Sequence, residues 1–139
     1  MQLVFDRTEA DVLLGNGKGQ YGPGDLNRVE QALADLIILA KQLDIHLNLT
    51  TKTNWGFDDL FSVEEWPVQS QMERYNRNVH SLRDVFNLKC QLPENMQALN
   101  WEKANQIEET LQTVYLRVRS VLDIYKYSGE LIAGEENYL

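Results

Sequence analysis

Three segments of the chain carry apolar side chains at steps of three and four residues, the spacing that gathers side chains on one face of an α-helix. These segments predict helices over 25–43, 70–88 and 100–125. Because an amphipathic helix cannot bury its apolar face alone, the three together predict a mainly α fold, built as a three-helix bundle. The apolar positions are Leu26, Val29, Leu33, Leu36, Ile37, Ala40 and Leu43; Met72, Tyr75, Val79, Leu82 and Phe86; and Ala104, Ile107, Leu111, Val114, Val118, Val121, Leu122 and Tyr125.

Polar residues mark the starts of these helices. Asp25 and Asn100 each precede an apolar stripe and are expected to be N-caps, whose side-chain oxygens accept a bond from a backbone N–H of the first turn. Ser70, with Glu73 three residues later, is a capping box. The three helices therefore have local start signals as well as apolar faces.

The N-terminal region is less regular. Thr8 and Asp11 resemble a capping box and predict one or two helical turns. Over 15–24, five glycines and one proline stand among few apolar residues, which predicts a glycine-rich loop before the first long helix.

The pattern changes to alternation over 45–53, with apolar side chains at Ile45, Leu47 and Leu49. Alternation predicts one short strand, a small β appendage to the bundle. A strand needs a partner for its backbone hydrogen bonds, and residues 3–5, the C-terminal tail or a neighbouring subunit could each provide one.

Two further segments lack helical periodicity. Residues 55–66 gather large aromatic side chains, which either plug the end of the bundle or anchor a partner. The tail over 127–139 contains Ser-Gly-Glu and Ala-Gly-Glu steps, and we expect it to be extended and to dock on another surface. The aromatic residues are Trp55, Phe57, Phe61 and Trp66.

Composition restricts the class of protein. At 139 residues the chain is expected to form a single domain over 1–139. Its 13 basic and 21 acidic side chains give a net charge of −8, which argues against nucleic-acid binding because such binding depends on Lys and Arg neutralising phosphates. The longest apolar run, 36–40, is too short for a membrane span. The single cysteine, Cys90, excludes an internal disulfide.

The sequence predicts no catalytic, cofactor or metal site. The loop over 15–19 lacks the Ser or Thr that follows the lysine of a phosphate-binding loop, and its glycine spacing is wrong. His46 and His80 show no metal-ligand spacing. Glu108 and Glu109 are adjacent, so on a helix they point about 100° apart and are expected to be solvated charges. An enzyme is therefore the disfavoured class.

A set of short motifs resembles a family of uncharacterised structural proteins from tailed bacteriophages and prophages of Gram-positive bacteria. The resemblance spans nearly the whole chain. Its carriers are Asp6-Arg7-Thr8, Asp11-Val12, Lys18-Gly19, Tyr21, Asp25-Leu26-Asn27-Arg28-Val29-Glu30, Lys52, Trp55, Met72, Arg74-Tyr75, Asn78-Val79, Leu82-Arg83, Leu92-Pro93, Met96, Leu99, Ala104-Asn105, Ile107-Glu108, Leu111, Tyr127-Ser128-Gly129-Glu130 and Ala133-Gly134-Glu135.

The resemblance implies a non-enzymatic virion protein of the tail tip or baseplate, assembled in the bacterial host cytoplasm. Its partners would be other tail or baseplate proteins and further copies of itself, in a ring or adaptor. Members of this family are often modules of longer chains, whereas this chain stops shortly after Ala133-Gly134-Glu135, so we expect a free-standing adaptor. The alternative is a small prophage-encoded host-directed or regulatory binding module.

The same resemblance suggests candidate interface residues. Tyr21 and Trp55 are expected to be anchors, with Lys18 and Lys52 as polar contacts, although each could instead support the fold. Asn78 and Asn105 lie inside predicted helices and suggest buried hydrogen bonds between helices. The remaining interface candidates are Phe57, Phe61, Trp66, Tyr127, Glu130 and Glu135.

Overall fold

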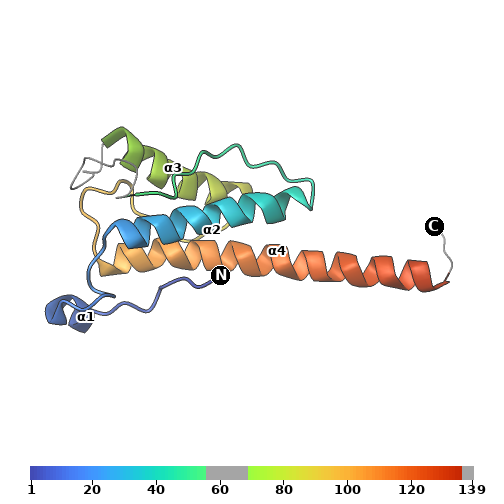
Figure 1. The fold of residues 1–139 in the computed structure, drawn as a ribbon, viewed down its shortest axis with the longest axis horizontal. Coiled ribbons are helices and arrows are strands. Elements are labelled where there is room, and N and C mark those ends of the chain that lie inside the picture. Colours follow the sequence, from blue (N-terminus) through green and yellow to red (C-terminus); the bar gives the residue numbers. More distant parts are fainter. Residues whose placement is uncertain (56–68, 136–139) are drawn as a thin grey trace.

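The computed structural model describes residues 1–55 and 69–135, with side chains described as far as Tyr125. The described chain forms four helices, so the prediction of a mainly α helical bundle is confirmed (Figure 1). The expected aromatic positions at 57, 61 and 66 lie outside the described residues. The helices are α1 (Glu9–Leu14), α2 (Pro23–Lys41), α3 (Gln69–Val85) and α4 (Trp101–Glu135).

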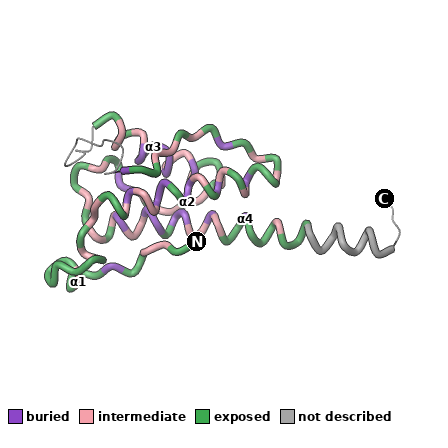
Figure 2. The backbone as a smooth tube through the Cα atoms, in the orientation of Figure 1, coloured by how far each residue is buried: buried purple, intermediate pink, exposed green. Residues whose placement is uncertain are grey.

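The bundle is formed by α2 and α3, which both pack against the N-terminal part of α4. The buried side chains lie where these helices meet, and α4 continues beyond the bundle (Figure 2). The buried core agrees with the predicted stripes except at the end of the last one, where Val121 and Tyr125 are exposed. It consists of Leu26, Val29, Ala32, Leu33, Leu36, Ala40, Leu47, Trp55, Tyr75, Val79, Leu82, Ile107, Leu111, Val114 and Val118.

The predicted caps hold at two of the helix starts. Thr8 and Asp11 form a capping box before α1, and Asn100 Oδ1 accepts the Lys103 N–H at 2.8 Å at the start of α4. The prediction of Asp25 as the N-cap of α2 is wrong by three residues. The N-cap is Gly22, and the Asp25 carboxylate accepts its N–H at 2.8 Å from inside the first turn.

The prediction of a strand over 45–53 is wrong, because these residues form an irregular segment without strand pairing. The alternation itself is real, since Leu47 is buried and Ile45 and Leu49 pack against the core. Side chains take the place of a partner strand at Thr50, whose carbonyl accepts bonds from α3. The alternating pattern therefore indicates which side of the segment faces the core. The Thr50 carbonyl has its hydrogen-bond donors without a partner strand.

The prediction of an extended tail over 127–139 is wrong for its first part, because α4 continues as a helix to Glu135. Gly129 and Gly134 each cost a helix about 1 kcal/mol relative to alanine, which weakens a helix without forbidding it. The helix is therefore 35 residues long, longer than the predicted 26.

The glycine-rich loop is held by two backbone requirements. Gly15 ends α1 with φ of +66°, a left-handed conformation that favours glycine. Gly19 lies directly against α1, where a Cβ would stand 2.2 Å from the Asp11 carbonyl oxygen. The loop therefore folds back onto the helix that precedes it.

Replacing Gly19 with alanine should destabilise the protein, because the added methyl meets backbone that must shift. We expect a loss of roughly 1–3 kcal/mol in the free energy of unfolding, measured by urea denaturation. Gly17→Ala is the matched control, since nothing lies within 4 Å of a Cβ there. Equal stabilities for the two variants would contradict the close approach at Gly19.

Candidate functional site

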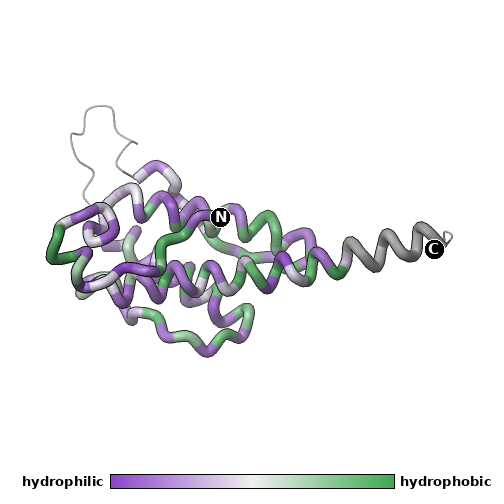
Figure 3. Tube along the Cα trace, turned by 90° about the horizontal axis from the view of Figure 1, so that it is seen from below, coloured by the Kyte–Doolittle hydropathy of each residue, from purple (hydrophilic) through white to green (hydrophobic). Residues whose placement is uncertain are grey.

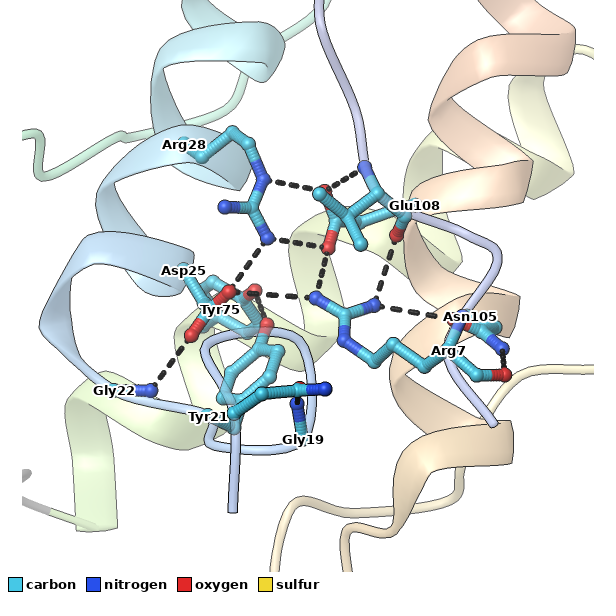
Figure 4. A network of polar contacts seen from close by, with 11 residues as sticks. Arg7, Gly19, Tyr21, Gly22, Asp25, Arg28, Tyr75, Asn105 and Glu108 are labelled. Atoms are coloured by element: carbon cyan, nitrogen blue, oxygen red, sulfur yellow. Dashed lines mark hydrogen bonds and ion pairs between the residues drawn. The ribbon is translucent and has the colours of Figure 1, made fainter. Parts of the chain in front are cut away.

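A buried carboxylate, Glu108 of α4, is the centre of a polar network between α4, α2 and the N-terminal segment (Figure 4). Its Oε1 accepts from Arg28 Nε at 2.7 Å and from the Val4 N–H at 2.9 Å. Its Oε2 accepts from Arg7 Nη2 at 2.6 Å and from Arg28 Nη2 at 2.8 Å. Four donors use the full acceptor capacity of an ionised carboxylate.

Asp25, in the first turn of α2, completes the charge balance. Its Oδ1 lies 2.6 Å from Arg28 Nη2 and 3.4 Å from Arg7 Nη2. Two arginines thus face two carboxylates, and a buried charge is tolerated only when it is paired in this way. Hydrogen bonding to Glu108 raises the pKa of Arg28 further above its already high value, so this guanidinium stays charged.

Arg7 also attaches the N-terminal segment to α4. Its backbone N–H donates to Asn105 Oδ1 at 3.1 Å, and its carbonyl accepts from Asn105 Nδ2 at 3.0 Å. Its guanidinium returns to the Val4 carbonyl at 2.8 Å. The segment before α1 has no regular secondary structure. It is held on α4 by these bonds to the Asn105 side chain.

Two tyrosine hydroxyls bond to each other beside this network, joining the glycine-rich loop to α3. Tyr21 and Tyr75 share a short hydrogen bond, and the Arg7 guanidinium lies 5.5 Å from the centre of the Tyr21 ring. Burial raises the pKa of both phenols, because the charged phenolate would lose its hydration.

A second buried carboxylate, Glu30 of α2, joins α3 and the irregular segment that follows α2. Arg74 of α3 binds it with two bonds of 2.8 Å, one to each oxygen. The indole Nε1–H of Trp55 donates to Oε2 at 2.6 Å. This bidentate geometry is the strong form of an arginine–carboxylate pair.

The backbone around Trp55 is held by α2 and α3. Asn27 bonds both the Trp55 N–H, at 2.6 Å, and the Trp55 carbonyl, at 3.0 Å. The Thr50 carbonyl accepts from Arg74 Nη1 at 2.5 Å and from Asn78 Nδ2 at 2.8 Å. Lys52 Nζ lies 5.3 Å from the Trp55 ring centre. These contacts fix residues 50–55 against the bundle.

Both buried carboxylates are already fully engaged with donors, which limits their chemistry. A general acid or base must reach a proton of its substrate, and Glu30 and Glu108 are shielded from solvent by their own partners. Across the described part of the chain, no three His, Cys, Asp or Glu side chains gather closely enough to hold a metal ion. The arrangement is suited to holding segments together.

The predicted interface residues are distributed over different environments. Trp55 is 1% exposed, so its side chain supports the fold, the second of the two roles expected for it. Tyr21 is half-buried and Lys18 is exposed, pairing with Asp6 at 2.8 Å. These two line a shared hollow whose described walls include neither Lys52 nor Trp55.

At the C-terminal end, the structure describes only the backbone of three further candidates. Tyr127, Glu130 and Glu135 lie on α4, and their side chains are outside the described part of the chain.

The sequence analysis did not predict Glu108 and Glu30 as the central residues of the two networks. Glu108 was predicted to be solvated and is fully buried, whereas its neighbour Glu109 is exposed. The sequence feature that indicates burial of Glu108 is its position in the apolar stripe, directly after Ile107. Asn78 and Asn105 make part-buried bonds to the backbone of irregular segments, so the prediction of buried bonds between helices is wrong.

Comparison with known proteins adds no relative: no family model matches the chain, and neither a curated protein nor a solved structure is similar to it. Within residues 1–55 and 69–135, no helix combines the length and the apolarity that crossing a membrane requires.

Replacing Glu108 with glutamine should cost about 3–5 kcal/mol of stability, because it leaves the buried Arg7 and the half-buried Arg28 with Asp25 as their one remaining carboxylate and turns an amide donor towards them. Glu109→Gln makes the same chemical change one residue later at an exposed position, and should stay within about 0.5 kcal/mol of the parent. Urea unfolding measures both. Similar losses for the two variants would contradict a special role for Glu108.

Alkaline pH should unfold the protein through Tyr21 and Tyr75. The folded pKa of each phenol is raised above the unfolded value of about 10. Stability is therefore fully present below pH 10 and falls as pH rises further, since only the unfolded chain then releases these protons. Phenolate absorbance at 295 nm should show their ionisation only together with loss of helical circular dichroism. Ionisation of all six tyrosines in a folded chain would contradict this.

Proposed function

We propose that the chain is a non-enzymatic structural protein of a phage or phage-derived tail, acting as an oligomeric adaptor or attachment module of the tail or baseplate. Its partners are other tail proteins and further copies of itself. The proposal starts from the resemblance to structural proteins of tailed phages and prophages, and it is supported by where the residues that carry this resemblance lie in the fold.

The observation that carries the proposal is the convergence of those residues. Polar residues of the resembling motifs, separated by up to about a hundred positions in the sequence, meet in the two buried networks. This convergence supports the proposal, because residues that hold a fold together are ones that members of one family are expected to share. The converging motif residues are Arg7, Tyr21, Asp25, Asn27, Arg28, Glu30, Trp55, Arg74, Tyr75, Asn78, Asn105 and Glu108.

The contacts that these residues make agree with a role in assembly. Ion pairs and hydrogen bonds hold the N-terminal segment, the glycine-rich loop and residues 50–55 on the helices, which makes a rigid body. Apolar side chains remain exposed at the two extremes of this body, Leu13 and Leu14 of α1 and Ile124 and Tyr125 of α4. A structural adaptor needs a rigid body with contact surfaces at separate places.

Mass spectrometry of intact, gradient-purified phage particles from the producing strain tests the proposal. We expect peptides of this chain at a fixed, low ratio to the major tube protein, because an adaptor is present in a defined copy number. Abundant protein in the cell lysate together with its absence from particles would contradict the proposal and favour the regulatory alternative.

A further inference from the structure

The glycine-rich loop contains an asparagine followed directly by glycine, Asn16-Gly17, and no other asparagine of the chain is followed by glycine. In such a pair the backbone nitrogen of the second residue can attack the side-chain amide of the first, because glycine has no side chain to obstruct the approach. α1 and this loop lie at one end of the molecule, opposite the C-terminal part of α4 (Figure 1 and Figure 3). A chemical change in the loop can therefore occur while the three long helices stay packed.

The nucleophile of this reaction, the Gly17 nitrogen, is accessible. Beyond its chain neighbours, no atom lies within 4 Å of the place where a Cβ on Gly17 would stand. Within residues 1–55 and 69–135, no acceptor binds the Gly17 N–H. Gly17 and Asn16 also line the same open hollow of about 620 Å³, which has room for many water molecules. The nitrogen, the amide that it attacks and the solvent that completes the reaction can therefore meet.

Two hydrogen bonds hold the Asn16 amide in the loop. Its Oδ1 accepts from the Gly19 N–H at 3.0 Å, and its Nδ2 donates to Asp11 Oδ1 at 2.8 Å. The Gly19 N–H stabilises the negative charge that develops on Oδ1 during attack. The bond from Nδ2 to Asp11 must open before the nitrogen can leave, and an exposed bond of this kind opposes opening by about tenfold or less. The loop therefore leaves the amide reactive.

We propose that Asn16 is a site of spontaneous deamidation. The Gly17 nitrogen forms a bond to Asn16 Cγ, and the bond from Cγ to Nδ2 breaks. Nδ2 leaves as ammonia, and water carries to it the proton that Gly17 loses. The product is a cyclic succinimide, which one water molecule opens at either carbonyl to give aspartate or isoaspartate at position 16. Water is the single co-reactant, so the reaction is a property of the chain itself.

The reaction changes the contact between the loop and α1. Asp11 Oδ1, which accepts from Asn16, would face a second carboxylate instead. The bond from Asn16 is the largest of the causes that lower the pKa of Asp11, so this pKa should rise when the amide is lost. Isoaspartate also lengthens the main chain close to Gly19, which packs directly on the Asp11 carbonyl. Deamidation therefore alters the loop that carries Lys18 and Tyr21, two of the candidate interface residues.

Peptide mapping of the purified full chain, kept at mildly alkaline pH, tests the proposal. Trypsin cleaves after Arg7 and Lys18, so residues 8–18 form one peptide whose single asparagine is Asn16. Mass spectrometry should show this peptide gaining the mass that accompanies exchange of an amide for an acid, as two separable products. The peptide of residues 42–52 is the internal control, because its single asparagine, Asn48, is also exposed but precedes Leu49. It should react at least tenfold more slowly.

Two variants test the mechanism and its consequence. Gly17→Ala should slow the reaction at least fivefold, because the added methyl obstructs the attacking nitrogen while the surrounding space accommodates it. Asn16→Asp carries the aspartate product from the start, and NMR titration of its side-chain carboxyl groups should show a higher pKa for Asp11 than in the parent chain. Helical circular dichroism verifies that both variants fold.

Three outcomes would overturn the inference. One is an equal rate for the peptides that contain Asn16 and Asn48. Another is an unchanged rate in Gly17→Ala. The third is a rate in the folded chain that is far more than tenfold below the rate of the same chain unfolded in urea, because the loop would then protect Asn16. None of these results depends on whether the protein is found in particles, so this inference and the proposed function can fail separately.

Discussion

The burial of Glu108 is the constraint on which most of the structure depends. A carboxylate without solvent contact must be met by donors, and Arg7, Arg28 and the Val4 N–H supply four hydrogen bonds to it. Because these donors come from the N-terminal segment and α2, one side chain of α4 holds three parts of the chain together. Glu30 does the same for α2, α3 and the segment containing Trp55. The bundle thus has two polar joints within an apolar core.

The helices could be predicted from the sequence because their signals are local. Apolar spacing and caps such as Thr8 and Asn100 lie within a few residues of the structure they specify. The polar networks could not be predicted in the same way. Arg7 and Glu108 are about a hundred positions apart, and only the packing of α4 brings them together. The position of Glu108 beside Ile107 in an apolar stripe indicates that it is buried. The sequence does not indicate which residues donate hydrogen bonds to it.

The incorrect predictions of a strand and of an extended tail both come from local patterns. Alternation over 45–53 correctly placed Leu47 towards the core, but the pattern cannot distinguish a paired strand from an irregular segment in which side chains bond the Thr50 carbonyl. The glycines near the C-terminus suggested that the helix ends early, yet α4 continues through Gly129 and Gly134. A long helix that leaves its bundle exposes apolar side chains such as Ile124 and Tyr125.

Because Glu108 bonds both the N-terminal segment and α2, the N-terminal segment and the bundle should unfold as one cooperative unit. Hydrogen exchange measured by NMR at the Val4 and Arg7 amides tests this, since these N–H groups donate to Glu108 and Asn105. Both amides should exchange with the same free energy as core amides of α4 such as Leu111, through global unfolding. Rapid exchange of Val4 and Arg7 while Leu111 stays protected would contradict it.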